Sequence, residues 1–294
     1  FLSGCAYYNT FYYAKRYYNL AERSVQASAS DKLPPDAVQK YDNAIKQAAK
    51  VIKFHSGSRW VDDALYLMGA AYCGKRDYEE GLRKFDELTA NFPKSKWVPW
   101  ALYRSGLAHF ERKNYEQMDT YFARVLESYP EFERRDDILF TQARAAELRR
   151  DRKEAVRRFR ELVDRYPKSP RAPESLLRIG DLYFDGGFAD SAFTSYAEMG
   201  RLARDDETWR KAQLKAADAL VRMGRADESV AMLRELLPED ALASVASQGR
   251  PTELWPAEIY VGLSRALNAN EQPLQALEAL RIVTSLYPTS SYAA

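Results

Sequence analysis

The side chains that most often perform catalysis are scarce in this sequence. Histidine occurs only at His55 and His109, and cysteine only at Cys5 and Cys73, which is too few for a metal site built from several histidines or paired cysteines. The H-E-x-x-H, G-x-S-x-G, Walker A and G-x-G-x-x-G patterns are also missing. We interpret His109 as a helix-packing residue. The sequence therefore predicts a protein without enzymatic activity, metal or cofactor.

Three acidic pairs could in principle act as general acids and bases: Asp62-Asp63, Asp136-Asp137 and Asp205-Asp206. Each pair stands where a helix is expected to start, and negative charge there complements the helix dipole. We interpret the pairs as helix caps.

Cys5 is the residue with the clearest chemical role. Leu2-Ser3-Gly4-Cys5 resembles the lipobox of bacterial lipoproteins, in which leucine, a small residue and glycine precede a cysteine that is acylated. The resemblance implies that residues 1–5 hold the signal-peptide remnant and the lipidation site. Ala6, where an aspartate would signal inner-membrane retention, implies the outer membrane. The alternative is that Cys5 is an ordinary small apolar residue.

The elements that position these residues follow a repeat of 37 residues. Ser58-Arg-Trp-Val-Asp-Asp-Ala-Leu-Tyr66 returns as Ser95-Lys-Trp-Val-Pro-Trp-Ala-Leu-Tyr103. Small residues keep the same period at Gly69, Gly106, Ala143, Gly180 and Ala217, and bulky ones at Phe85, Phe122, Phe159, Tyr196 and Leu233. Fixed periods of this length are typical of solenoids.

Each repeat contains the apolar spacing of two short helices, as in Leu65, Met68, Gly69 and Tyr72. Proline ends the second helix, as at Phe92-Pro-Lys-Ser95, because it lacks an amide donor. The serine that follows can cap the next helix. Small residues let the paired helices approach closely, and the aromatic side chain fills the adjacent space. Neither helix can bury its apolar face alone, so neighbouring pairs must stack.

These positions resemble the tetratricopeptide repeat. The resemblance implies an all-α, tetratricopeptide-type α-solenoid, a right-handed superhelix of antiparallel helix pairs. The predicted organisation is an aromatic-rich helix pair at 6–56, five tandem repeats at 57–238, a loop at 239–256, and a sixth repeat with the start of a further helix at 257–294. We expect the tyrosine-rich first helix to lie near the membrane interface or to pack on the first repeat.

The resemblance also implies a binding groove, because the first helix of each tetratricopeptide unit lines the concave face. Transferring the inward positions gives Tyr66, Trp100, Tyr103, Phe110, Phe140, Arg144 and Phe184. Aromatic side chains are enriched at binding hot spots. The alternative is that some of these side chains belong to the core between adjacent helices.

Charge is nearly balanced overall, with 44 Lys and Arg against 42 Asp and Glu, so composition predicts no nucleic-acid partner. One local excess includes Arg150, Lys153, Arg157 and Arg158. This basic patch is either a solvated face with acidic partners at i, i+4 spacing or a docking site for an acidic surface or lipid phosphate.

The lipobox, the aromatic start and the Tyr-Pro-x-Ser turns together resemble the outer-membrane assembly lipoproteins of the BamD/ComL/YfiO family. The resemblance implies a lipid-anchored scaffold on the periplasmic face of a bacterial outer membrane, with barrel precursors, other extended peptides or envelope assembly subunits as partners. Two alternatives remain: a periplasmic repeat protein that coordinates envelope constriction or peptidoglycan synthesis, and a soluble cytoplasmic adaptor.

Overall fold

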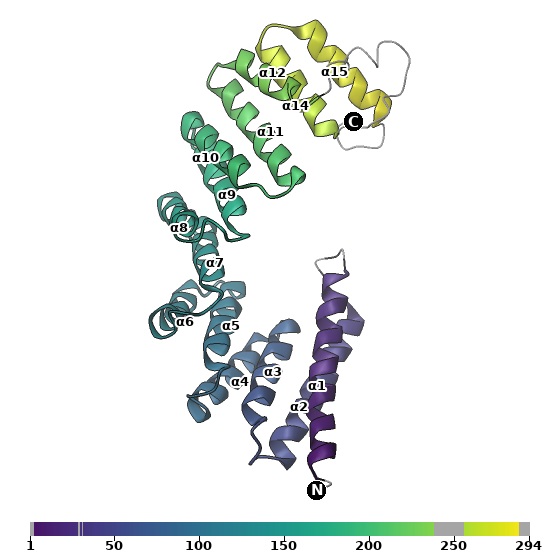
Figure 1. The fold of residues 1–294 in the computed structure, drawn as a ribbon, viewed down its shortest axis with the longest axis vertical. Helices are drawn as coiled ribbons and strands as arrows, with labels where there is room; N and C mark the ends of the chain where they lie inside the picture. Colours follow the sequence, from purple (N-terminus) through teal and green to yellow (C-terminus); the bar gives the residue numbers. More distant parts are fainter. Residues whose placement is uncertain (1–2, 29, 31, 238–255, 288–294) are drawn as a thin grey trace. The chain divides into compact units, whose positions relative to one another are not determined.

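The computed structural model describes residues 3–28, 30, 32–237 and 256–287, with side chains from Thr10 onward. This part of the chain forms helices without strands (Figure 1), in agreement with the predicted all-α solenoid. The expected loop at 239–256 and the helix expected after Tyr287 lie almost wholly outside the described residues.

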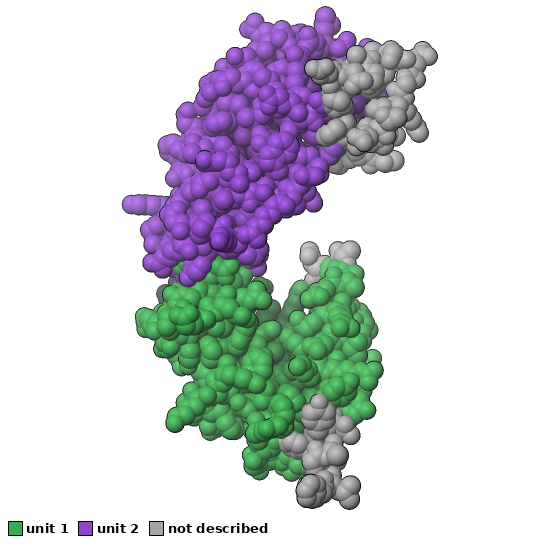
Figure 2. Space-filling view, in the orientation of Figure 1, with its two compact units in different colours: residues 1–141 green, residues 142–294 purple. Residues whose placement is uncertain are grey.

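The chain divides into two compact units, Phe1–Thr141 and Gln142–Ala294 (Figure 2). The helices of the first unit are α1 Ser3–Gln26, α2 Pro35–Phe54, α3 Val61–Gly74, α4 Tyr78–Asn91, α5 Val98–Glu111 and α6 Tyr115–Ser128. Helix α7, Arg135–Leu148, crosses the boundary between the units. The second unit continues with α8 Arg152–Arg165, α9 Ala172–Asp185, α10 Ala189–Leu202, α11 Asp206–Arg222, α12 Ala226–Arg234, α14 Ala257–Ala269 and α15 Pro273–Leu286.

Helix pairs form because each aromatic side chain of a second helix occupies the space left by a small residue on the first. A Cβ atom at Gly69 would lie 2.5 Å from the ring of Phe85, and one at Gly106 or Gly180 would overlap Phe122 or Tyr196. Phe85, Phe122 and Tyr196 are all buried. The helices that start at residues 61, 98, 135 and 172 keep the 37-residue period.

The turns between repeats differ from the predicted serine caps. The Oγ atoms of Ser58, Ser95 and Ser169 accept hydrogen bonds of 3.0–3.1 Å from the amides two residues later. Those amides precede the first residue of the following helix, so each serine stabilises the turn that enters the helix and does not cap the helix itself.

The acidic pairs have two different roles. Asp205 is a true cap of α11, because its Oδ1 accepts a 2.7 Å bond from the amide of Thr208. Asp62 and Asp63 instead reach the next repeat: Asp62 accepts from the Ser95 hydroxyl at 2.6 Å, and Asp63 from the indole of Trp97 at 2.8 Å. Both residues lie in the first turn of α3, as predicted, and Asp62 also accepts a 2.9 Å bond from the Asp63 amide. The carboxylates of this pair therefore serve the helix start and also join consecutive repeats.

Candidate functional site

The predicted groove residues of unit 1 do not form one exposed strip. Tyr103 is 8% exposed and Phe140 is 7% exposed, so both belong to the core and are unavailable to a ligand. Tyr103 is covered by Phe132 at a ring distance of 5.5 Å, and its hydroxyl donates to Asp137. This placement corrects the prediction for these two side chains.

Three predicted groove residues of unit 1 remain partly exposed. Tyr66 on α3 stacks on Trp97 with ring centroids 4.2 Å apart and planes inclined by 12°. Trp100 on α5 meets Phe132 edge to face at 5.1 Å. Phe110, at the end of the same helix, lies 6.1 Å from Tyr115. Their rings are held by neighbouring rings, so the exposed edges are positioned without large entropy cost.

Sequence reasoning missed a polar cluster that links the first helices of three consecutive pairs in unit 1. Arg104 on α5 donates from Nε to the hydroxyl of Tyr66 on α3 and from Nη2 to the hydroxyl of Tyr18 on α1, both at 3.1 Å. The Tyr41 hydroxyl donates to Glu22 at 2.5 Å, and its ring lies 5.9 Å from that of Tyr18. We name these five residues the Arg104 cluster. The sequence signal for this cluster is Arg104 itself, a charged residue among the apolar residues of α5.

In unit 2, the two predicted groove residues are already engaged. The guanidinium of Arg144 lies 3.1 Å from Glu147. The guanidinium of Arg222 lies 4.5 Å from the ring centroid of Phe184 and donates to its carbonyl oxygen at 3.1 Å. A ligand at this position would have to displace Arg222 from the ring.

Two adjoining hollows in unit 2 were not predicted. One, of about 330 Å³, lies between α9 and α11 and has Leu177 and Met199 in its lining. The other, of about 380 Å³, lies between α11 and α14 and includes Leu214 and Ile259. Volumes of this size suit side chains of a bound segment. We refer to them as the α11 hollows.

In the described part of the chain, some basic side chains around the α11 hollows form ion pairs with carboxylates, and others do not. Lys215 bonds Asp181 at 2.8 Å, and Arg265 lies 3.2 Å from Asp218, whose pKa is raised by burial. Lys211 lines both hollows and is exposed, and within the described residues it forms no ion pair. Lys211 is thus the cation in this lining best placed to meet a ligand.

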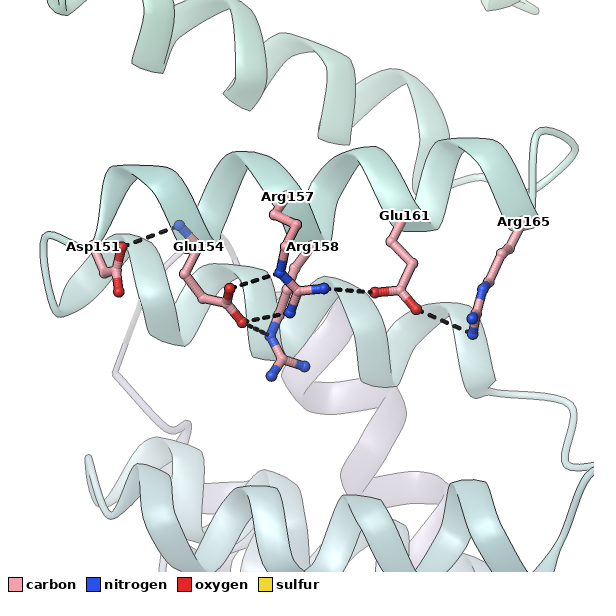
Figure 3. A network of polar contacts seen from close by, with 6 residues as sticks. All are labelled: Asp151, Glu154, Arg157, Arg158, Glu161 and Arg165. Atoms are coloured by element: carbon pink, nitrogen blue, oxygen red, sulfur yellow. Dashed lines mark hydrogen bonds and ion pairs between the residues drawn. The ribbon is translucent and has the colours of Figure 1, made fainter.

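The basic patch on α8 is largely neutralised by its own helix (Figure 3). Arg157 and Arg158 both bond Glu154, at 2.6 and 2.7 Å, and Glu161 lies 3.1 Å from Arg165. The hydrogen bond from Arg157 is the largest influence that lowers the pKa of Glu154 to about 2. The structure favours the solvated-face interpretation for Arg157 and Arg158.

Arg150 and Lys153, the other two residues of the predicted patch, are exposed. Arg150 occupies the turn before α8 with φ of 62°, in the left-handed region. Both remain candidates for docking, but they lie beside the paired carboxylates of α8.

The histidine and cysteine side chains that could do chemistry, His109 and Cys73, are packed against neighbouring residues. His109 stacks on Tyr121 at 5.3 Å, as a packing residue would, and burial lowers its pKa. Cys73 lies in the crowded contact with Gly81, and burial raises its pKa to about 11, which disfavours the reactive thiolate. Cys5 falls in α1, but its side chain lies outside the described residues.

The described residues contain neither a metal-binding group nor a membrane-spanning helix. No three acidic, histidine or cysteine side chains there are grouped so that they could hold a metal ion. No helix in that part of the chain has the length and apolar character needed to cross a membrane.

Solved structures identify the fold. The C-terminal part of a tetratricopeptide-repeat protein from Cytophaga hutchinsonii has 12% identity over 96% of this chain and 97% of its own, with a TM-score of 0.66. A tetratricopeptide-repeat protein from Parabacteroides merdae has 13% identity over 96% of each chain, with a TM-score of 0.47. PilF of Pseudomonas aeruginosa has 16% identity over 79% of this chain and 94% of its own, with a TM-score of 0.48. Because the identities are this low, these structures support an inference about the fold alone. That inference rests on the first of the three, which has the TM-score of 0.66.

Comparison with curated proteins gives no significant match. The family model YfiO, described as an outer membrane lipoprotein, matches residues 24–184. This range covers more than half of the 294 residues and includes α2 to α8 and nearly all of α9. The chain therefore belongs to the YfiO family of outer membrane lipoproteins.

Proposed function

We propose that this protein is a lipid-anchored scaffold on the periplasmic face of the outer membrane that acts in the assembly of β-barrel proteins. Membership of the YfiO family is the observation that carries the proposal. The family and the tetratricopeptide fold are those of protein-interaction scaffolds, which are not enzymes. The Leu-Ser-Gly-Cys5 motif supplies the residue that would be acylated.

Extended segments of barrel precursors are the ligands that the proposal implies. In unit 2, the α11 hollows adjoin along the same helix and share Glu207 and Lys211. An extended segment could place alternate side chains into successive hollows, since these project every second residue. Apolar side chains in the lining and a free cation on the rim fit the amphipathic pattern of a barrel strand.

The anchor is tested by the mass and location of the secreted protein. Full-length protein expressed in a diderm bacterium should carry an acylated Cys5 and fractionate with the outer membrane. Cys5→Ala removes the thiol that accepts the lipid and should release the protein into the soluble periplasmic fraction, because several acyl chains together provide stable anchoring. Intact-mass measurement checks the modification directly. An unmodified, soluble wild-type protein would refute the lipoprotein assignment.

Peptide capture is tested at Lys211. A labelled peptide of about ten residues from a barrel strand, the length that spans the membrane, should bind the wild-type chain. Lys211→Glu should weaken the binding by about tenfold, the effect of losing one contact of about 1.4 kcal/mol. Fluorescence anisotropy measures the dissociation constant.

The matched control is Lys50→Glu, the same change at an exposed lysine on α2, which should leave peptide affinity unchanged. Equal affinities for both variants would exclude the α11 hollows as the peptide site.

A further inference from the structure

Helix α1 has an exposed stripe that no helix of unit 1 covers. Its members are spaced at i, i+3, i+4, i+7 and i+11, so they lie along one side of the helix: Tyr12, Lys15, Arg16, Asn19 and Arg23. We name these five residues the α1 stripe. Tyr12 is 51% exposed and the neighbouring Tyr13 is 43% exposed, although both are large rings that gain from leaving water.

The α1 stripe lines an open groove of about 620 Å³. Phe11, Leu20 and Trp60 also line the groove, and none of the described residues in the lining is acidic. Phe11 stacks on Trp60 at 5.3 Å, and the guanidinium of Arg59 lies 4.9 Å from the Trp60 ring centroid. The groove therefore combines cations with an aromatic wall.

The cations of the α1 stripe differ from those of α8. Within the described residues, Lys15, Arg16 and Arg23 form no ion pair, whereas three arginines of α8 bond Glu154 and Glu161 (Figure 3): Arg157, Arg158 and Arg165. The single acidic residue of α1 is Glu22, which accepts its hydrogen bond from Tyr41 in the Arg104 cluster. The positive charge of the stripe is thus left for an anionic partner.

We propose that the α1 stripe lies flat on the anionic headgroups of the membrane that holds the lipid anchor. Lysine and arginine attract lipid phosphates, and tyrosine rings prefer the boundary between headgroups and acyl chains. The stripe from Tyr12 to Arg23 extends roughly 16 Å along the helix at 1.5 Å per residue, enough to reach several headgroups. This proposal rests on the proposed function for its membrane.

The position of Cys5 favours a membrane over an acidic protein as the partner. Cys5 lies in α1, seven residues before Tyr12, which is roughly 10 Å along the helix. An acyl chain at Cys5 would place the start of the stripe within roughly 10 Å of the headgroups, which is about the Debye length at 0.1 M salt. The acyl chain would not bring a soluble acidic protein closer to the α1 stripe.

The test uses the full chain with Cys5→Ala, so that no acyl chain contributes to binding. Cosedimentation is measured with vesicles of phosphatidylethanolamine and phosphatidylglycerol and with neutral phosphatidylcholine vesicles. The anionic vesicles should bind, and Lys15→Gln, Arg16→Gln and Arg23→Gln together should reduce the partition coefficient by roughly 100-fold, at about fivefold per cation. Binding should also fall with added salt.

The matched control removes the same charge at three exposed lysines outside α1 and outside the basic patch, with Lys94→Gln, Lys113→Gln and Lys168→Gln. These side chains are exposed, and the control should retain most of the vesicle binding. An equal loss in both variants, or no loss in the α1 variant, would overturn the proposal. Capture of poly-glutamate by a chain that ignores anionic vesicles would also overturn it and identify an acidic protein as the partner.

Failure of this inference is distinguishable from failure of the proposed function. Acylation of Cys5 is measured on the wild-type protein, whereas vesicle binding is measured without the thiol. An unacylated wild type with intact vesicle binding by the α1 stripe would refute the lipid anchor alone. An acylated wild type whose α1 variant binds vesicles normally would refute the stripe alone.

Discussion

Replacing Arg104 with methionine should weaken the packing of α1, α3 and α5 in unit 1 by about 3 kcal/mol, of which the bond to α1 supplies about half. The guanidinium makes two hydrogen bonds of 3.1 Å, to Tyr66 and to Tyr18, which lie 38 and 86 residues away in the sequence. Each charge-assisted bond of this kind contributes about 1.5 kcal/mol or more. Methionine keeps much of the apolar stem but none of the donors. Hydrogen exchange of the α1 and α3 amides measures the change, because local opening is read residue by residue.

Two variants separate this effect from a general loss of charge. Tyr66→Phe removes one acceptor and should cost about half as much. Arg157→Met removes an exposed arginine whose ion pairs lie within one helix, and such pairs contribute about 0–1 kcal/mol. If α1 exchanges at the wild-type rate in the Arg104 variant, the cluster does not hold the helix in place.

The repeat architecture could be predicted because it depends on residue size at fixed spacing. Gly106 and Phe122 recur one and two periods away as Gly69 with Phe85 and Gly180 with Tyr196, and each pair makes the same contact in the structure. A period of 37 residues supplies several independent observations of one motif. The starts of α3, α5, α7 and α9 follow from it.

The binding residues were harder to predict because the exposure of a side chain in one repeat depends on which side chains of the next repeat cover it. Tyr103 occupies a position that faces the groove in the repeat pattern, yet Phe132 and Asp137 from the following turn and helix cover it. No spacing rule within one repeat contains that information. The α11 hollows likewise depend on side chains from four helices.

The sequence left two interpretations of the basic run open, and the structure favours the solvated face. The run from Arg149 to Arg165 has the highest density of basic residues, but Glu154 and Glu161 lie one turn from the arginines that they neutralise. The three cations of the α1 stripe are too few to form a dense basic run in the sequence. What distinguishes them is the absence of an acidic partner among the described residues, and pairing is a property of the fold.

Raising the pH above about 10 should unfold the protein steeply, because several buried tyrosines resist ionisation in the folded state. Tyr41 and Tyr196 are 1% exposed, and Tyr103 is 8% exposed. Their hydroxyls donate to Glu22, Asp181 and Asp137 respectively. Burial first, and then the neighbouring carboxylate, raise the pKa of each hydroxyl above its ordinary value of 10.

The sign of the effect follows from the proton balance. Below about pH 10 both states keep these protons and the stabilisation is complete; above it the unfolded chain loses them while the folded protein retains them, so the free energy of unfolding falls. Each tyrosine lowers the free energy of unfolding by about 1.4 kcal/mol per pH unit, so three lower it by about 4 kcal/mol per pH unit. This is a large share of the 5–15 kcal/mol that is typical of a folded domain. Tyrosinate absorbance and helical circular dichroism should therefore change together. Replacing Tyr41, Tyr103 and Tyr196 with phenylalanine should make the loss of helix with rising pH shallower. If the tyrosinate absorbance instead reaches its full value before any helix is lost, these hydroxyls ionise within the folded protein and the prediction is wrong.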